Sequence, residues 1–434
     1  MDMIGYMKKR DILMQQVLDK IKDYVSAAKS TDTLTVSARA NELIKLAKLR
    51  SSESLKYIDL QRFFAANFQF DDSTIVLDKG LISASILPEA IHSHLVFVDG
   101  KFSSELSDVS AYKDIDIQSL ASCSHQKQTF LSEIEEDLYA LFNRSLATHA
   151  HVIKLSDKSM HLPLQILHVF SGKKDLLALM PRLHIHLEEN AQLQIMQTYV
   201  SLDTSKSCWL NPYLTISLEK RANVNLYTAL FAESHDWCFE TIRAQVKESA
   251  QLEIVGFSMG GITSRSDIKI DLLQPHASAF INNVSFTCED HHQHTRCQVG
   301  HYASETLSRQ LSKVVVADSS FTTNDGMIYV APKVEKIDSY QLNKNIILDN
   351  QAKAYSRPNL SIYSDDVKAS HGATTSNLSD EFLFYFSTRG ISKNQAKKLF
   401  LFGFFEEILG LVKISGFRDK VNRALDKFLD RFST

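Results

Sequence analysis

Alternation between apolar and polar residues dominates the middle of the chain. Four segments, at residues 181–199, 214–231, 241–257 and 268–284, each show an alternating strand, a polar corner, an alanine and a second alternating strand. The corner alanines are spaced 31, 28 and 27 residues apart by subtraction, and they are Ala191, Ala222, Ala250 and Ala277. Such a period predicts stacked coils, each burying its apolar face against its neighbours, as in a parallel β-helix. A meander of hairpins forming a sandwich is the alternative that periodicity alone leaves open.

Glycine is scarce, at 14 of 434 residues. Folds with many tight turns use glycine because it adopts positive φ at no steric cost, so the low count disfavours propellers and jelly rolls. The strands must therefore turn by other means, and small alanines at a fixed corner allow the coils to stack closely. Pro332 and Pro358 are also expected at corners, where a missing N–H costs no ladder hydrogen bond.

Helical patterns precede this β region. Apolar spacing predicts helices at residues 7–28, 38–50 and about 131–143, and the segment 95–108 reads as a hairpin that turns at Asp99-Gly100. The first 150 residues are thus expected to form a mostly helical N-terminal region with a hairpin, and residues 151–375 to form the β-helix core.

A change from strand to helix periodicity marks a domain junction near residue 375. We expect Val367 to open a short strand, residues 371–375 to form a turn around His371, and Ser379 to cap a helix that ends at Arg389-Gly390. Ser392 and Gln395 form a capping-box pattern for the next helix, and a last amphipathic helix covers residues 418–432. Residues 376–434 are therefore expected to form a C-terminal helical domain whose wide apolar faces suit a partner.

Composition narrows the functional classes. A net charge of -3 without a basic stripe argues against nucleic acid as a partner. The N-terminus is charged where a secretory signal needs an apolar core, and no apolar run reaches the length of a membrane span, so a cytoplasmic protein is expected. The segment around Gly260 lacks the spacing and the lysine of a phosphate loop, and no cysteine or serine lies in a nucleophile motif.

Potential metal ligands gather between residues 291 and 301. They are His291, His292, His294, Cys297 and His301. On a strand, His292 and His294 share one face while Cys297 points to the other, so a closed zinc site would require a bend. The alternative is that these side chains line the outside of the β-helix. The five cysteines include no C-x-x-C pair, which predicts neither a disulfide framework nor a zinc ribbon.

Several segments nevertheless resemble motifs of a known protein family. DDVKASHGAT (365–374), LFYFSTRGI (383–391), GFFEEIL (403–409) and QHTRCQVGHYASETLSRQL (293–311) resemble blocks of the SufB/SufD family, scaffold proteins of the Suf iron–sulfur cluster assembly system, with a spelling nearest to SufD members. Two departures matter for metal chemistry. Ala369 stands where the family usually has cysteine, and Glu305 stands where a second histidine usually follows His301.

The resemblance implies a fold and a set of partners. It implies a right-handed parallel β-helix core with helical N- and C-terminal regions, acting as a scaffold rather than an enzyme, with a SufB-like subunit and a SufC-like ATPase. His371 becomes the candidate iron or cluster ligand and His301 a second candidate. The residues expected to bind partners are Phe384, Tyr385, Arg389, Phe400 and Phe404.

The same resemblance implies that the isolated chain binds no cofactor stably and that a cluster is held only transiently within a complex. Two alternatives come from other classes. One is a β-helix enzyme acting on carbohydrate, although the adjacent pairs Glu188-Glu189 and Asp365-Asp366 diverge on a strand instead of converging on a groove. The other is a self-associating solenoid, since the open end of a β-helix is a sheet edge that a second copy could pair.

Overall fold

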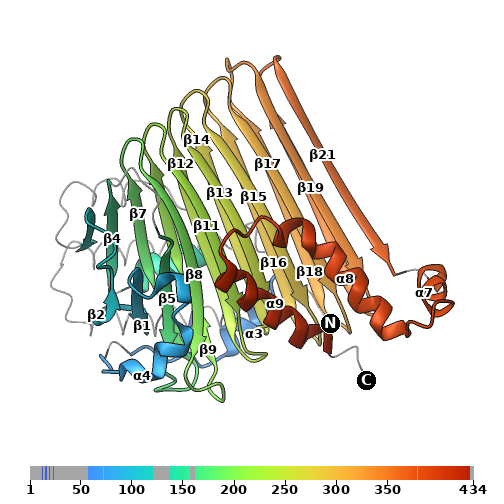
Figure 1. Cartoon of the computed structure of the whole chain (residues 1–434), viewed down its shortest axis with the longest axis horizontal. Helices are drawn as coiled ribbons and strands as arrows, with labels where there is room; N and C mark the ends of the chain where they lie inside the picture. Colours follow the sequence, from blue (N-terminus) through green and yellow to red (C-terminus); the bar gives the residue numbers. More distant parts are fainter. Residues whose placement is uncertain are drawn as a thin grey trace.

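Two long sheets face each other along the whole length of the structure (Figure 1). The computed structural model describes residues 57–71, 73–120, 137–147, 149–156, 162–378 and 380–430, together with five positions between residues 12 and 23. The chain passes back and forth between the sheets and forms a parallel β-solenoid of about eight turns, with helices at both ends of the sequence. The predicted fold class is confirmed.

Each sheet is a ladder of strands from successive coils. The ten-stranded sheet runs, in spatial order, β2 (Lys101–Asp108), β1 (His94–Val98), β5 (Leu164–Phe170), β8 (Gln192–Ser201), β11 (Asn223–Phe231), β13 (Gln251–Met259), β15 (Ser278–Thr287), β17 (Leu307–Val316), β19 (Ile337–Ile347) and β21 (Val367–Asn377). The eleven-stranded sheet runs β20 (Lys353–Ile362), β18 (Phe321–Val330), β16 (His292–His301), β14 (Thr263–Leu272), β12 (Trp237–Val246), β10 (Tyr213–Leu218), β7 (Arg182–Leu187), β4 (Ala150–Leu155) and β3 (Ile115–Ser119), with β6 (Leu177–Leu179) and β9 (Cys208–Leu210) beside it.

The pairing excludes the hairpin sandwich. In the described chain only β1 with β2 and β3 with β4 pair antiparallel, and every other pair is parallel. Parallel neighbours such as β11 and β13 are separated by a strand of the other sheet, as a coil requires. The predicted hairpin at residues 95–108 is present, and its turn residues Asp99 and Gly100 both have positive φ, at 48° and 86°.

The corners show how the coils turn without glycine. The residue before each corner alanine lies in the left-handed region, with φ of 65° at Asn190, 57° at Arg221, 56° at Ser249 and 61° at His276. The alanines themselves are fully buried. The carbonyl of Ala222 accepts from the Gln251 amide of the next coil at 2.9 Å, and Ala191, Ala250 and Ala277 accept in the same way. Each corner therefore joins a left-handed residue to a small residue whose carbonyl links two coils.

An apolar core runs through the first coils. Leucine, isoleucine, valine and alanine from the inner faces of both sheets form one cluster that extends from Leu95 to Val299. It includes all four corner alanines, which explains their small size. These side chains alternate along each strand with outward residues, because successive Cβ atoms point to opposite faces.

Two C-terminal helices cover the outer face of the ten-stranded sheet. Helix α8 (Lys393–Leu409) opens with the predicted capping box of Ser392 and Gln395, and α9 (Ser415–Leu429) follows (Figure 1). Phe405 of α8 packs on Phe286 of β15 with ring centroids 4.5 Å apart. The apolar faces that were expected to need a partner are therefore largely covered by the chain's own sheet. Helix α7 (Asp380–Ser387) lies beyond β21, and the turn that follows it closes at Gly390, whose φ is 77°.

The N-terminal segment covers the opposite outer face. Helices α3 (Leu60–Ala65) and α6 (Leu138–Leu146) pack aromatic side chains onto Trp209, Trp237 and Phe239 of the eleven-stranded sheet. Three short turns follow α3: α4 (Lys79–Ile82), η2 (Ser83–Ser85) and η3 (Pro88–Ala90). The helices predicted at residues 7–28 and 38–50, the start of the one predicted from residue 131, and the Ser379 cap lie outside the described residues, apart from the five positions in the first helix.

Two local predictions were wrong. Residues 371–375 are not a turn, because Val367–Asn377 is one continuous strand, β21, with its pairing to β19 unbroken. Pro358 is not at a corner but in the middle of β20, whereas Pro332 does lie in a turn. Since β20 is the edge strand of its sheet, a missing N–H there removes no ladder hydrogen bond on the open side.

A buried ion cluster ties α6 to the solenoid. Asp137, the N-cap of α6, accepts from Arg265 of β14 at 2.6 and 3.1 Å, and the same guanidinium donates to Asp267 at 3.1 Å. Burial alone would raise the pKa of Asp267, but the guanidiniums of Arg243, Arg265 and Arg296 hold it well below its ordinary value. Arg265 and both carboxylates are inaccessible to solvent. Each buried charge is therefore stabilised by its oppositely charged neighbours and not by water.

We therefore expect Arg265→Met to destabilise the protein by about 3–5 kcal/mol, because it removes a buried cation that the Asp137 and Asp267 carboxylates share. The matched control is Arg357→Met, which breaks a partly exposed pair with Asp325 on the same outer face and should cost about 1 kcal/mol or less. Urea unfolding of both variants measures the difference. Equal losses in the two variants would show that Arg265 contributes no more than a surface pair.

Candidate functional site at the open end of the solenoid

The last coil of the solenoid is open on one side. Strands β20 and β21 each have a single sheet neighbour, β18 and β19, and no strand of the described chain pairs with their outer edges. They are 10 and 11 residues long, so the end of the solenoid presents two extended rows of backbone N–H and C=O groups (Figure 1). Such edges are templates for pairing with another chain.

His371 lies at the centre of β21, in register with Gln341 of β19. Gln341 is buried on the inner face of its sheet, and paired residues of parallel strands share a face. His371 therefore shares the inner face with Ala369 and Ala373 on either side of it, yet it is exposed because no further coil covers β21. A cysteine at position 369 would stand on the same face of the edge as this imidazole.

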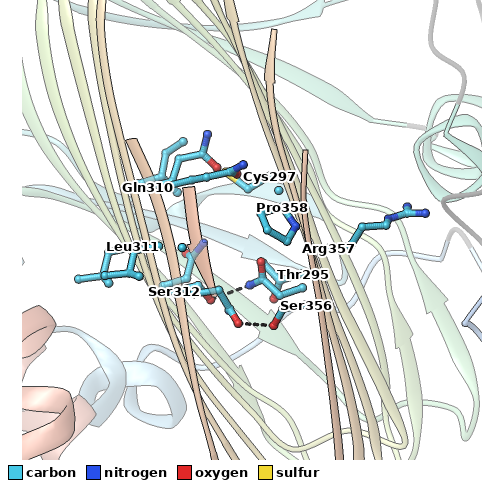
Figure 2. Close-up of a pocket in the computed structure, with 16 residues that line it drawn as sticks. Thr295, Cys297, Gln310, Leu311, Ser312, Ser356, Arg357 and Pro358 are labelled. Atoms are coloured by element: carbon cyan, nitrogen blue, oxygen red, sulfur yellow. Dashed lines mark hydrogen bonds between the residues drawn. The ribbon is translucent and has the colours of Figure 1, made fainter. Parts of the chain in front are cut away.

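The interior just behind this edge is polar. A cavity of about 20 Å³ lies between the sheets, lined by amide, hydroxyl and a few apolar side chains from β15 to β20 and by Gly372 of β21 (Figure 2). Asn324 donates to Ser312 across the interior at 2.8 Å, and Ser356 donates to Asn343 at 2.5 Å. Figure 2 shows Arg357 pointing away from this cavity, toward the outer face where it pairs with Asp325 at 2.6 Å.

The second histidine candidate, His301, lies inside the solenoid rather than on its outside. It is fully buried, and its ring nitrogens contact the Thr306 hydroxyl at 2.8 Å and the Ser308 hydroxyl at 3.0 Å. Because the Thr306 hydroxyl donates to the Ala303 carbonyl, it accepts from the imidazole, which places the ring proton on Nδ1. Burial lowers the pKa of His301 to about 4, so the ring is neutral near pH 7.

Glu305, the motif position that replaces a histidine, does not meet His301. Its carboxylate accepts from Lys336 at 2.7 Å and contacts the His276 imidazole at 3.1 Å on the surface. The structure therefore separates these two motif positions. His301 is instead connected to the open edge through hydroxyl groups. It contacts Ser308, whose hydroxyl lies 2.6 Å from the hydroxyl of Ser339, and Ser339 is paired with Ala369 of β21.

The remaining histidines of the 291–301 cluster do not converge either. His292 and His294 lie on the outer face of β16, and Cys297 lies on the inner face in the apolar core, as strand alternation predicts. His294 contacts the Thr323 hydroxyl at 2.8 Å, and burial lowers its pKa to about 3. Within the described chain, no three His, Cys, Asp or Glu side chains are grouped closely enough to hold a metal ion.

The partner-binding candidates divide into two groups. Phe384 and Tyr385 of α7 are 70% and 53% exposed, and Arg389 lies over the Tyr385 ring at 3.7 Å. By contrast, Phe400 packs on Phe382 with ring centroids 5.0 Å apart, and Phe404 lies 4.8 Å from the Lys313 ammonium. The latter two are therefore half-buried within their own chain.

Sequence reasoning missed Leu399, which is 54% exposed on α8. It was not among the residues expected to bind a partner, and only the packing of α8 on the sheet shows that it is exposed. Phe384, Tyr385 and Leu399 are exposed on two helices that pack through Phe382 and Phe400, and we call these three side chains the α7–α8 apolar surface. No helix in the described part of the chain is both long and apolar enough to cross a membrane.

Comparison with known proteins agrees with this geometry. The core-domain model of the SufBD proteins, described as SUF system FeS cluster assembly, matches residues 168–404. The chain is 26% identical over 330 residues to the iron–sulfur cluster assembly protein SufD of Escherichia coli, covering 75% of this chain and 77% of that protein. It is 22% identical over 432 residues to an iron–sulfur cluster assembly SufBD family protein of Synechocystis, covering 94% of each.

A chloroplastic protein of Arabidopsis thaliana, ABCI7, is 29% identical over 236 residues, which span 53% of this chain and 48% of that protein. The matched core domain takes in the solenoid from β5 onward, the edge strand β21, helix α7 and most of α8. Because that match covers more than half of the sequence, the chain belongs to the SufB/SufD family of SUF-system iron–sulfur cluster assembly proteins.

Proposed function

We propose that this chain is a SufD-like scaffold subunit that works in the cytoplasm and supports cluster assembly together with a SufB-like subunit and a SufC-like ATPase. The observation that carries the proposal is the open edge formed by β20 and β21, with the exposed His371 on it. A strand of a SufB-like subunit pairing with this edge would complete the backbone hydrogen bonds and bring its own ligands beside His371.

The chemistry of the edge supports shared rather than internal ligation. His371 provides one soft nitrogen donor, and Ala369 provides none where the family usually has a thiol. A cluster or an iron ion, handled here as cargo, needs several ligands, so the others would come from the partner. The isolated chain would then bind iron weakly, and a stable site would exist only in the complex.

A second surface suits the ATPase. The α7–α8 apolar surface lies beyond β21, and α7 follows that strand closely in sequence (Figure 1). Exposed aromatic side chains with an adjacent guanidinium are typical of interaction hot spots. An ATPase bound there would act on α7, which follows the strand that carries His371, so movement of α7 could reach the edge over a short distance.

The carbohydrate-enzyme alternative has less support. Glu188 pairs with Lys154 and Glu189 with Arg221 at 2.6 Å, so the two carboxylates bind separate cations on the surface. We propose that the chain performs no turnover of its own. A self-associating solenoid would use the same open edge. The co-purification experiment distinguishes it from the proposed complex.

Co-purification from cell extract tests the partners. We expect the full-length chain to elute with a SufB-like and a SufC-like subunit. A partner strand would cover the long edges of β20 and β21, which otherwise could pair with unrelated chains. Size-exclusion chromatography with light scattering gives the composition. A homodimer that persists when both partners are present would favour self-association instead.

For His371→Ala, we expect the free energy of unfolding to change by no more than about 0.5 kcal/mol, because the imidazole is exposed. Maturation of an iron–sulfur reporter enzyme in cells lacking the native gene should nevertheless fall sharply. Iron bound by the isolated wild-type chain should be far below one ion per chain.

The matched control is His92→Ala, which removes another exposed imidazole, located on the turn before β1. It should leave reporter maturation unchanged. Normal maturation with His371→Ala would assign this subunit a purely architectural role.

The double variant Phe384→Ser, Tyr385→Ser should weaken binding of the SufC-like ATPase by at least about tenfold, since exposed aromatic anchors carry much of an interface's energy. Binding measured by titration calorimetry with the purified ATPase gives this ratio. Ile91→Ser is the control. Ile91 is 55% exposed, and it lies in the segment before β1, far in sequence from α7 and α8. Unchanged affinity in the double variant would exclude the α7–α8 apolar surface as the docking site.

A further inference from the structure

A line of polar side chains runs through the interior of the last coils on the eleven-stranded sheet. Strand pairing places one inward residue of each coil in the same register, so the residues form a ladder along the solenoid axis. Its five members are Glu240, Ser266, Thr295, Asn324 and Ser356, from β12, β14, β16, β18 and β20. The ladder begins deep in the solenoid and ends on the edge strand.

A second ladder faces it from the ten-stranded sheet. Its members, in register from β8 to β19, are Gln197, Thr228, Gly256, Asn283, Ser312 and Asn343. We call the two ladders together the polar seam. In these coils the seam runs beside the apolar core, because Ile242 and Ile268, two residues from Glu240 and Ser266 on the same strand faces, belong to that core.

Glycines make room for this seam. A Cβ atom at Gly256 would lie 2.6 Å from the Asn283 side-chain oxygen, and one at Gly326 would lie 2.2 Å from the Gln341 side-chain oxygen. Glycine in a strand weakens the sheet and marks a place where another group approaches closely. Two of the 14 glycines therefore lie where the absence of a side chain leaves space for an amide group in the interior.

Several buried polar atoms along the seam have no partner within the described chain. They include the Gln310 and Asn343 side-chain nitrogens and the Asn345 side-chain oxygen. Gln310 and Asn343 line the cavity of about 20 Å³ shown in Figure 2, which has room for about one water molecule. Leaving such an atom unsatisfied costs about 1–3 kcal/mol, so atoms of this kind are the usual partners of buried water.

Glu240 closes the inner end of the seam. Its carboxyl is buried, one oxygen accepts from Ser266 at 3.2 Å, and burial raises its pKa to about 7. Tyr199 and Cys238 beside it are uncharged near neutral pH, because burial raises the pKa of both groups. His168, which stacks on Tyr199, is neutral as well, because burial lowers its pKa to about 3. Asp236 immediately precedes β12, and its carboxyl group accepts from the Cys208 amide at 2.9 Å.

We propose that the polar seam is a hydrated proton path that connects Glu240 with solvent at the open end between β20 and β21. Water molecules held by the unpartnered amides complete the chain between the hydroxyl groups of Ser266, Thr295, Ser312 and Ser356. A proton that leaves the Glu240 carboxyl passes to the first water molecule, and another proton is released to solvent at the open end between β20 and β21. Only O–H bonds therefore break and form. The inference does not depend on the proposed role in cluster assembly.

Two measurements on the full-length protein test the path. A crystal structure should show ordered water within hydrogen-bond distance of Gln310 Nε2 and Asn343 Nδ2. Infrared difference spectroscopy should show a carboxylic acid band that disappears as the pH rises through about 7 and that is absent from Glu240→Gln. In the wild type this band should exchange its proton for deuterium within seconds of transfer to D₂O.

Thr295→Val removes one hydroxyl from the seam with almost no change in shape. We expect it to slow deuterium exchange at Glu240 by at least about tenfold, because exchange then requires local opening of the solenoid. Ser356→Ala, at the mouth, is a second variant with the same expected direction and little risk to folding. The matched control is Gln298→Leu, which removes a polar group from the outer face of the same strand as Thr295 and should leave the rate unchanged.

Equal exchange rates in the wild type and in both seam variants would overturn the proton path. A seam without ordered water would overturn it as well. Slower exchange in both variants, with Gln298→Leu like the wild type, would establish it.

Discussion

The parallel, in-register stacking of coils is the constraint on which the rest of this protein depends. Each coil is held to the next by backbone hydrogen bonds and by corner alanines whose carbonyls link neighbouring coils. A left-handed residue before each corner lets the chain turn, and the alanine keeps the turn narrow enough to repeat. Once this register is set, every inward side chain lies above the corresponding side chain of the previous coil.

That repetition makes the interior of the solenoid a set of ladders whose chemistry can change from coil to coil. From Leu95 to Val299 most of these ladders are aliphatic and form the apolar core, with the polar seam beside them. In the last coils serine, threonine and asparagine replace them, so less apolar area is buried inside. The outer cover by α8 and α9, with Phe405 against Phe286, supplies apolar burial to this part of the protein from the other side of the sheet.

The same constraint explains why the end of the solenoid is suited to a partner. A stack of parallel coils cannot close on itself, so its last strands remain open unless something covers them. Here the open strand carries His371 and leads toward α7, so the edge, the candidate ligand and an exposed aromatic surface lie close together in sequence. The polar seam reaches the same end from within.

Local patterns in the sequence determined the elements. Alternation predicted the strands, Ala191 and its counterparts predicted the corners, Ser392 with Gln395 predicted the start of α8, and Asp99-Gly100 predicted the hairpin. These features depend on side-chain periodicity and backbone conformation, which neighbouring residues control. The family motifs identified the edge strand and α7 as the region of interest, although they did not reveal its conformation.

Only the tertiary structure decided which groups are buried, paired or free. Residues 371–375 resemble a turn in composition, but pairing along all of β19 holds them in a strand, and Pro358 is tolerated because β20 is an edge. His301 lies inside because strand alternation turns it toward the core, and Phe400 and Phe404 are half-covered because α8 lies on the chain's own sheet and beside α7. Burial and pairing depend on residues distant in sequence, so no local pattern contains them.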